Sequence, residues 1–222
     1  MLYVVSTPIG NLKDITLRAI EVLKKVDIIA AEDTRHTKKL TLNYGINTPL
    51  TSYFEHNKVS KGQYLLRLLQ EGKDVALASD AGTPGISDPG YHIIHLAIEN
   101  GIPLTAIPGP TAIIVALTVS GMPTHKFVFE GFLPLKQAAR RKRLTELSQE
   151  KRTIICYESP HRLVKCLIDI TDVLGNPQVA CVRELTKKFE EVRRQRATEL
   201  IKHFSTHKPR GEFVLIFNLD IT

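Results

Sequence analysis

The sequence predicts an α/β protein built on mostly parallel sheets, and two observations support this prediction. Short apolar runs, many of them β-branched, alternate with segments whose apolar residues recur at helical spacing, which is typical of β-α-β units. Few polar residues interrupt these runs, so the strands are expected to be covered on both faces. Gly121 and Pro123 interrupt the alternation, which then starts again. We therefore expect two α/β domains, residues 1–120 and residues 121–222.

In the first half, amphipathic segments separate the apolar runs, and several of these segments end at a glycine. Leu17, Ile20 and Leu23, for example, fall on one helical stripe. Gly45 and Gly72 are typical residues for ending a helix. The expected strands are residues 2–6, 28–31, 49–54, 74–79 and 104–107. The expected helices are residues 16–26, a stretch ending at residue 44, and residues 58–71, 91–100 and 111–119.

The second half repeats the pattern with longer intervals. Its expected strands are residues 127–132, 153–157, 178–183 and 212–219. Its expected helices are residues 160–174 and 197–206. The run at 136–143 holds five basic residues in eight and indicates either a solvated helix face or a surface that follows phosphates.

Composition indicates an ordinary globular protein of the cytoplasm. Hydrophobic residues make up 43% of the 222 residues and charged residues 24%. The three cysteines form no C-x-x-C pair, which favours reduced thiols over a disulfide framework. The amino-terminal apolar run ends at Ser6 and has no basic segment before it, so we do not expect a signal peptide.

The formal charge of +7 is distributed unevenly. Residues 1–120 hold 11 basic and 11 acidic residues, whereas residues 121–222 hold 19 and 12. A basic surface confined to one half is what a polyanionic partner such as RNA requires. The alternative is a solvated face that only keeps the protein soluble.

Several well-known sites are absent from the sequence. There is no G-x-G-x-x-G dinucleotide motif, no phosphate-binding G-K-[ST] and no G-x-S-x-G nucleophile motif. Two histidine pairs, at residues 92 and 95 and at residues 203 and 207, have no obvious third ligand. We therefore expect these histidines to be solvated or packed, and we expect no metal site.

Three loops of similar composition follow expected strands. They span residues 6–11, 80–90 and 108–112, and each combines glycine or proline with serine, threonine or aspartate. In open α/β sheets, ligands bind at the carboxyl ends of the strands. Any one loop could be only a tight turn, but three at one sheet edge predict a ligand-binding cleft.

Two charged clusters also follow expected strands. One is Glu32-Asp33-Thr34-Arg35 and the other is Glu158-Ser159-Pro160-His161-Arg162. Ser159 and Pro160 are typical of a helix start, where the helix dipole does not favour the cations that follow. Residues placed against local preference are more often functional, so both clusters are candidates for chemistry.

These loops and clusters, in this order, resemble the tetrapyrrole-methylase superfamily of S-adenosylmethionine enzymes, and within it the branch that methylates bacterial small-subunit ribosomal RNA. The resemblance runs from near one end of the chain to the other, and the ordered set is highly specific. The matching stretches are STPIGNL (6–12), AAEDTRHT (30–37), SDAGTPGISDPGY (79–91), PGPTA (108–112), EGFLP (130–134), YESPHR (157–162), RELTK (183–187) and GEFVLI (211–216).

The resemblance implies two α/β domains with the cofactor in the cleft between them, and a homodimer. It implies that the methyl group of S-adenosylmethionine goes to a cytidine ribose 2′-hydroxyl in the decoding region of the small-subunit (16S) RNA. We expect this RNA to be methylated within the assembled subunit, and naked RNA remains open as the alternative substrate. Precorrin-type relatives have glycine–aspartate–proline where this chain has Ser79-Asp80-Ala81, which disfavours a tetrapyrrole substrate. The cofactor contacts implied by position are Pro8, Asp80, Thr83, Thr111, Ala112, Tyr157 and Gly211.

A ribose hydroxyl is a poor nucleophile, so the reaction needs a proton acceptor beside it. Asp33 and Glu158 are the candidates for this role, and Glu32, His161 and Glu184 remain open as alternatives. The expected RNA contacts are Arg35, Arg140, Arg141, Lys142, Arg143, Arg162 and Lys187. Two other functions stay open: a precorrin-type tetrapyrrole methyltransferase, and a ribosomal RNA-binding module without catalytic activity.

Overall fold

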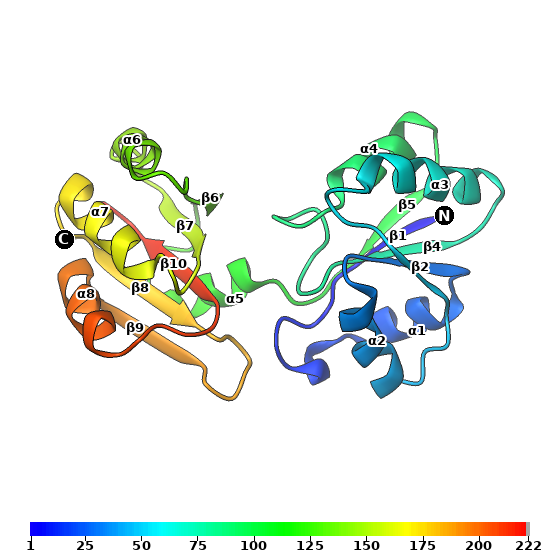
Figure 1. The fold of residues 1–222 in the computed structure, drawn as a ribbon, viewed down its shortest axis with the longest axis horizontal. Helices are drawn as coiled ribbons and strands as arrows, with labels where there is room; N and C mark the ends of the chain where they lie inside the picture. Colours follow the sequence, from blue (N-terminus) through cyan, green and yellow to red (C-terminus); the bar gives the residue numbers. More distant parts are fainter. Residues whose placement is uncertain (221–222) are drawn as a thin grey trace. The chain divides into compact units, whose positions relative to one another are not determined.

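The computed structural model describes residues 1–220. The chain divides into two compact units, Met1–Thr111 and Ala112–Thr222. Each unit contains one five-stranded sheet packed against helices (Figure 1). The expected boundary after residue 120 lies later in the chain than this division, because helix α5 (Ala112–Ser120) packs on the sheet of the second unit.

The sheet of the first unit is parallel throughout, as the alternation of strands and helices predicts. Its strand order is β3-β2-β4-β1-β5. The strands are β1 (Leu2–Val5), β2 (Ile28–Ala31), β3 (Leu50–Ser52), β4 (Val75–Ala78) and β5 (Leu104–Ile107). The helices are α1 (Leu17–Lys25), α2 (Thr34–Asn43), α3 (Lys58–Gln70) and α4 (Tyr91–Glu99), with a short 3₁₀ turn, η1 (Leu12–Asp14).

Helices cover both faces of this sheet, with α3 and α4 on one side and α1 and α2 on the other (Figure 1). Residues of β1 alternate between the two layers: Leu2 packs with Leu65 of α3, and Val5 packs with Leu23 of α1. Strands buried on both faces must be apolar along their whole length, which explains the uninterrupted apolar runs in the sequence.

The second sheet is mixed rather than mostly parallel. Its order is β6-β7-β10-β8-β9, and only β6 and β7 pair in parallel. The strands are β6 (Phe127–Phe132), β7 (Thr153–Glu158), β8 (Gln178–Arg183), β9 (Glu191–Arg196) and β10 (Phe213–Phe217). The helices α6 (Gln137–Leu147), α7 (Leu163–Leu174) and α8 (Ala197–Thr206) share one core with one face of this sheet.

The sequence did not predict β9, and its composition explains the omission. Among its six residues only Val192 is apolar, so neither alternation nor a hydrophobic run is visible. β9 nevertheless pairs with β8 from Glu191 to Arg196 and forms the edge of the sheet. Charged side chains on an edge strand hinder pairing with another chain, which accounts for a strand of this composition.

Helix α5 packs on strands β8, β9 and β10. It is apolar on almost every side, so it needs a partner surface. Arg194 of β9 donates hydrogen bonds to the carbonyl oxygens of Val119 and Ser120 at the end of the helix. These contacts satisfy carbonyl groups that a helix end leaves without partners.

The cysteines at positions 156, 166 and 181 are free thiols buried in the second unit, where they belong to its hydrophobic core. Burial raises the pKa of the Cys166 thiol well above its ordinary value, so the thiol is unreactive. Among residues 1–220, no helix is both long and apolar enough to cross a membrane.

Candidate active site

The parallel sheet of the first unit brings the expected ligand loops to one edge. Strands β2, β4, β1 and β5 lie side by side and run in the same direction, so their carboxyl ends are neighbours. The loops at 6–11, 80–90 and 108–112 leave this edge, as does the segment that begins at Glu32. The sequence-based placement of these loops on one sheet edge is confirmed.

The first two loops are joined by backbone hydrogen bonds. The N–H of Thr7 donates to the carbonyl of Gly82 at 2.9 Å, and the N–H of Gly82 donates back at 3.0 Å. The side chain of Thr7 donates to the carbonyl of Ser79 at 3.0 Å, and the hydroxyls of Ser6 and Thr83 lie 2.8 Å apart. Gly82 has φ +86°, a left-handed conformation that other residues rarely adopt.

The third loop packs directly on the first. A Cβ atom on Gly109 would lie 2.8 Å from the Cβ of Ser6, so only glycine allows this approach. Among the expected cofactor residues, Pro8 is buried here, whereas Thr83 and Thr111 are partly exposed. The edge therefore presents a tightly connected backbone with accessible hydroxyl groups.

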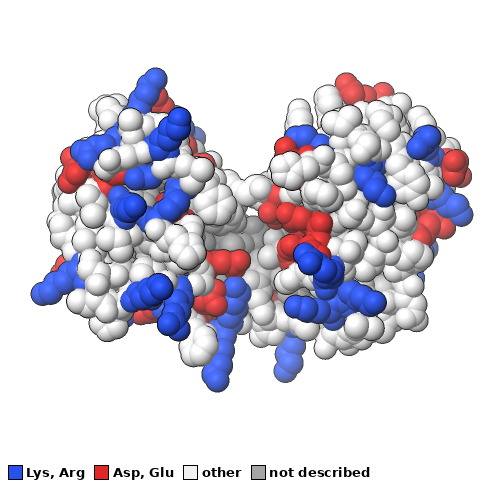
Figure 2. All heavy atoms as spheres, in the orientation of Figure 1, with Lys and Arg blue, Asp and Glu red and all other residues white. Residues whose placement is uncertain are grey.

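Three carboxylates lie together at the ends of β2 and β4. The N–H of Asp33 donates to Oδ1 of Asp80 at 3.0 Å, and the N–H of Asp80 donates to Oε2 of Glu32 at 3.3 Å. Figure 2 shows acidic side chains gathered on the visible face of the first unit. This group would attract the positive charges of a cationic ligand.

The carboxylates of Glu32 and Asp33 differ in basicity. Burial raises the pKa of Glu32, and the neighbouring charges of Asp80 and Asp33 add to the effect. Hydrogen bonds from the side chain and the N–H of Arg35 hold the pKa of Asp33 well below its ordinary value. Asp33 also caps the start of α2, and its carboxylate forms an ion pair with the Arg35 guanidinium at 2.6 Å. Glu32 is therefore the stronger base of the two.

In the second unit, Tyr157 and Glu158 end β7 beside the start of β10. Glu158 is buried and accepts hydrogen bonds from the N–H of Ser159 at 2.7 Å and from Arg162 at 3.1 Å. The helix that follows starts at Leu163, so the preceding cations lie in the turn before it rather than in its first turn. The Tyr157 ring packs edge-on against Phe129 and Phe132, with centroid distances of 5.0 and 5.6 Å.

The segment around Gly211 is held by the loop after β8. Glu184 and Glu212 exchange hydrogen bonds: the N–H of Glu184 donates to the carbonyl of Glu212 at 3.0 Å, and the N–H of Glu212 donates to Oε1 of Glu184 at 3.1 Å. Lys187 lies 2.9 Å from the Glu184 carboxylate and 2.7 Å from that of Glu212. Lys187, an expected RNA contact, thus has two carboxylate partners within the protein.

Burial and ion pairing have opposite effects on the pKa values of Lys187 and Glu184. Burial alone would lower the pKa of Lys187, but hydrogen bonds to Glu212 and Glu184 raise it above its ordinary value. Burial would raise the pKa of Glu184, but Lys187 lowers it below its ordinary value. Both groups are therefore charged at neutral pH. Sequence reasoning missed Glu212, although it follows a residue of the expected cofactor site.

Replacing Gly211 with alanine is expected to lower the free energy of unfolding by about 2–3 kcal/mol. Gly211 has φ +87°, and a Cβ there would collide with the Glu184 side chain, so conformational strain and overpacking add together. Gly175→Ala is the matched control, because Gly175 has φ +73° and, within residues 1–220, no atom beyond its local backbone and chain neighbours lies within 4 Å of its Cβ position. It is expected to cost about 1 kcal/mol. Equal losses in denaturant unfolding would contradict the proposed collision.

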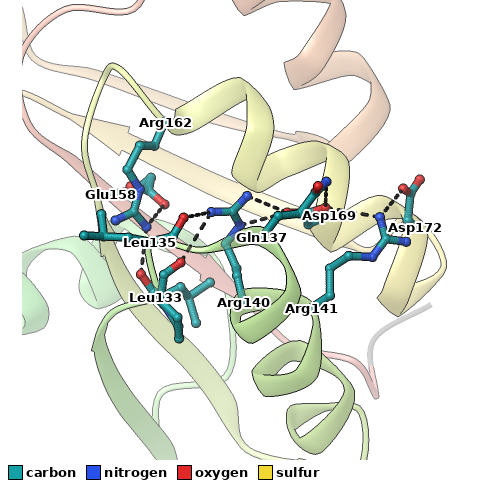
Figure 3. A network of polar contacts seen from close by, with 10 residues as sticks. Leu133, Leu135, Gln137, Arg140, Arg141, Glu158, Arg162, Asp169 and Asp172 are labelled. Atoms are coloured by element: carbon teal, nitrogen blue, oxygen red, sulfur yellow. Dashed lines mark hydrogen bonds and ion pairs between the residues drawn. The ribbon is translucent and has the colours of Figure 1, made fainter.

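The basic run at 136–143 is only partly free to form a cationic surface. Arg140 is buried and pairs with Asp169 at 2.6 Å, which corrects its expected role as an RNA contact (Figure 3). Arg141 also reaches Asp169, and Arg143 pairs with Glu130. Figure 2 shows basic side chains spread over the visible face of the second unit. The fold therefore uses part of the basic run to neutralise its own carboxylates.

Comparison of the sequence with known families and proteins gives a consistent match. The model of the tetrapyrrole (corrin/porphyrin) methylases matches residues 1–201. The chain is 51% identical over 217 residues to ribosomal RNA small subunit methyltransferase I of Synechocystis sp., covering 97% of this chain and 78% of that protein. It is 46% identical over 217 residues to the protein of the same name from Thermotoga maritima, covering 98% and 97%.

Solved structures share the fold at low sequence identity. A cobalt precorrin-4 methyltransferase superposes with a TM-score of 0.73 at 18% identity, covering 99% of this chain and 95% of that chain. Uroporphyrin-III-C-methyltransferase from Thermus thermophilus superposes with a TM-score of 0.69 at 20% identity, covering 98% and 94%. These similarities extend the comparison to the fold of nearly the whole chain.

Proposed function

The chain belongs to the tetrapyrrole methylase family, and we propose that it transfers the methyl group of S-adenosylmethionine to a cytidine ribose 2′-hydroxyl in the decoding region of small-subunit ribosomal RNA. It is an S-adenosylmethionine-dependent methyltransferase. One observation supports the RNA substrate above all: about half of the residues are identical, over nearly the whole chain, to relatives named ribosomal RNA small subunit methyltransferase I.

The edge of the first sheet fits the proposed cofactor. S-adenosylmethionine carries a sulfonium and an ammonium group, and Asp33 and Asp80 provide negative charge there. The glycines at 82 and 109 let the three loops pack closely on one another, because Gly82 has φ +86° and a Cβ at Gly109 would lie 2.8 Å from the Cβ of Ser6. We propose that the cofactor contacts are Pro8, Asp80, Thr83, Thr111, Ala112, Tyr157 and Gly211.

The chemistry requires positioning and one proton acceptor. Methyl transfer from a sulfonium is an in-line displacement, so holding the hydroxyl oxygen opposite the sulfur provides much of the rate. The hydroxyl must lose its proton as it attacks. Of the candidate carboxylates, Asp33 is weakened as a base by Arg35, and Glu158 is buried against Arg162. The raised pKa of Glu32 favours it as the general base.

Replacing Glu32 with glutamine is expected to lower the single-turnover rate of methyl transfer about a hundredfold while cofactor affinity is retained. The wild-type rate is expected to rise with pH as Glu32 ionises, with a midpoint above the ordinary glutamate pKa of about 4.3. In the variant this rise is expected to disappear.

Asp33→Asn and Glu158→Gln are the comparison variants for this experiment. Each removes a carboxylate from one of the other two candidates, and each is expected to keep the pH-dependent rise. If Glu32→Gln had wild-type kinetics and one comparison variant lost a hundredfold in rate, the residue replaced in that comparison variant would be the general base instead of Glu32.

The proposed function is tested by identifying the molecule that accepts the methyl group. The protein and methyl-labelled S-adenosylmethionine are incubated in three parallel reactions, each with a different substrate. The substrates are assembled small subunits lacking the modification, naked small-subunit RNA and uroporphyrinogen III. We expect label in the RNA of the assembled subunit and none in the tetrapyrrole. Label in the tetrapyrrole alone would favour the alternative methyltransferase activity, and RNA binding without transfer would favour a non-catalytic module. We further propose that the protein acts in the cytoplasm as a homodimer.

A further inference from the structure

Three successive backbone carbonyls in the segment at 132–136 point toward arginine side chains. Arg162 donates to the carbonyl of Leu133 at 2.7 Å. Arg140 donates to the carbonyls of Pro134 and Leu135 at 3.3 and 3.2 Å. Figure 3 shows the two guanidinium groups reaching the same short stretch of backbone. The path of this segment is therefore fixed through its main chain as well as through the buried side chain of Leu133.

Buried carboxylates hold the two arginines in turn. Asp169 is fully buried and accepts from Arg140 Nε at 2.8 Å and from Gln137 at 3.1 Å. Glu158, also buried, pairs with Arg162 at 3.1 Å. Buried charges that lose their partners are strongly unfavourable, so these pairs hold their geometry. The segment at 132–136 is thus anchored at successive positions to a rigid charged network.

The anchored segment presents apolar side chains to solvent. Phe132 is 57% exposed and Leu135 is 77% exposed, whereas Leu133 between them is buried. The Phe132 ring packs edge-on against the ring of Tyr157, at a centroid distance of 5.6 Å. Both side chains therefore lie at the surface of a segment whose backbone is fixed. A surface that displays an aromatic ring in this way is suited to binding a flat apolar group.

The charge around the segment is positive. Residues 131–143 contain five basic and no acidic residues. Arginines 140, 141 and 143 are paired with carboxylates, whereas Lys136 and Lys142 are exposed and have no ion-pair partner within residues 1–220. An exposed ring four residues before an unpaired lysine matches single-stranded RNA, whose bases stack on aromatic rings and whose phosphates attract cations.

We propose that Phe132, Leu135 and Lys136 form a contact surface for single-stranded RNA, with a base stacked on Phe132 and a phosphate beside Lys136. This inference rests on the proposed function, because it specifies how the RNA substrate is held. Arg140 and Arg162 act as positioning residues: they fix the backbone that presents the contact side chains. Arg140 therefore contributes to RNA binding from inside the protein and not as a phosphate contact.

The test measures binding of a fluorescein-labelled single-stranded oligoribonucleotide and, separately, of S-adenosylmethionine. Phe132→Ala is expected to weaken oligonucleotide binding about tenfold and to change cofactor affinity by less than about twofold. Phe132→Tyr keeps the ring and is expected to bind like the wild type. Lys136→Gln is expected to reduce the slope of log affinity against log salt by about one unit, whereas Phe132→Ala leaves the slope unchanged.

Leu17→Ala is the control for loss of an exposed apolar side chain, because Leu17 is a strongly exposed residue of α1 in the first unit. It is expected to leave both affinities unchanged. Wild-type oligonucleotide binding by Phe132→Ala would overturn the proposal, as would a loss of cofactor affinity in that variant with RNA binding intact. Methyl transfer to small subunits by the wild type is measured alongside. Its absence would count against the proposed function, independently of the contact surface.

Discussion

Replacing Asp169 with asparagine is expected to lower the free energy of unfolding by about 3–5 kcal/mol, measured by denaturant unfolding. Its carboxylate is fully buried and lies 2.6 Å from the buried Arg140 guanidinium. The substitution keeps the shape of the side chain but removes its charge, so a cation stays buried without a counter-charge. Gln137 and Arg141 lose an ionised acceptor in the same change.

Asp172→Asn provides the matched control for this prediction. Asp172 also pairs with Arg141, at 3.0 Å, but it is exposed (46% of its side chain) and its partner is open to solvent. An exposed ion pair contributes little to stability, so Asp172→Asn is expected to change the free energy of unfolding by no more than about 1 kcal/mol. If Asp169→Asn were no more destabilising than Asp172→Asn, burial would not be what makes the Arg140 pair essential.

Replacing Gly82 with valine is expected to reduce methyl transfer about a hundredfold and to weaken S-adenosylmethionine binding in calorimetry. Gly82 has φ +86° and exchanges two backbone hydrogen bonds with Thr7. A β-branched residue cannot adopt this conformation without strain, so the second loop must move away from the first. The proposed contacts at Pro8 and Thr83 would shift with it.

Gly72→Val separates this local effect from general loss of stability. Gly72 has φ +83°, and in the described part of the chain no atom other than those of its sequence neighbours lies within 4 Å of its Cβ position. Gly72 lies before β4, whereas Gly82 follows that strand. The backbone strain is therefore similar in the two variants, but in Gly72→Val it lies at the amino-terminal end of β4, away from the loops of the candidate site. Gly72→Val is expected to lose about 1–3 kcal/mol of stability and to keep its cofactor affinity. Equal cofactor affinities in the two variants would contradict the placement of the cofactor.

The first unit was more predictable from sequence than the second. Its strands are covered on both faces and read as apolar runs, and the parallel order follows from helices that separate them. In the second unit, β9 consists mostly of charged residues, so the sequence gives no sign that a strand follows β8. The antiparallel pair of β8 and β9 could therefore not be predicted. The mixed sheet follows from that hairpin, because a strand that returns through a short loop must pair antiparallel.

The candidate site was predictable where it depends on the order of the strands. Loops after neighbouring parallel strands must share an edge, so their composition was sufficient to bring them together. Pairing between distant side chains was not predictable. Nothing in a basic run reveals that Arg140 meets an aspartate 29 residues away. One signal was available: Asp169 interrupts the apolar stripe of its helix next to Ile170, and a carboxylate in that position needs a buried partner.

Mapping the methylated position in the RNA tests the proposed function most directly. Small subunits lacking the modification are incubated with the wild-type protein and S-adenosylmethionine, and their RNA is digested and sequenced by mass spectrometry. The proposed function predicts one new 2′-O-methylcytidine in the decoding region, and a hundredfold slower appearance of that nucleotide with Glu32→Gln. A methyl group on a base, at another nucleotide, or on no nucleotide at all would contradict it.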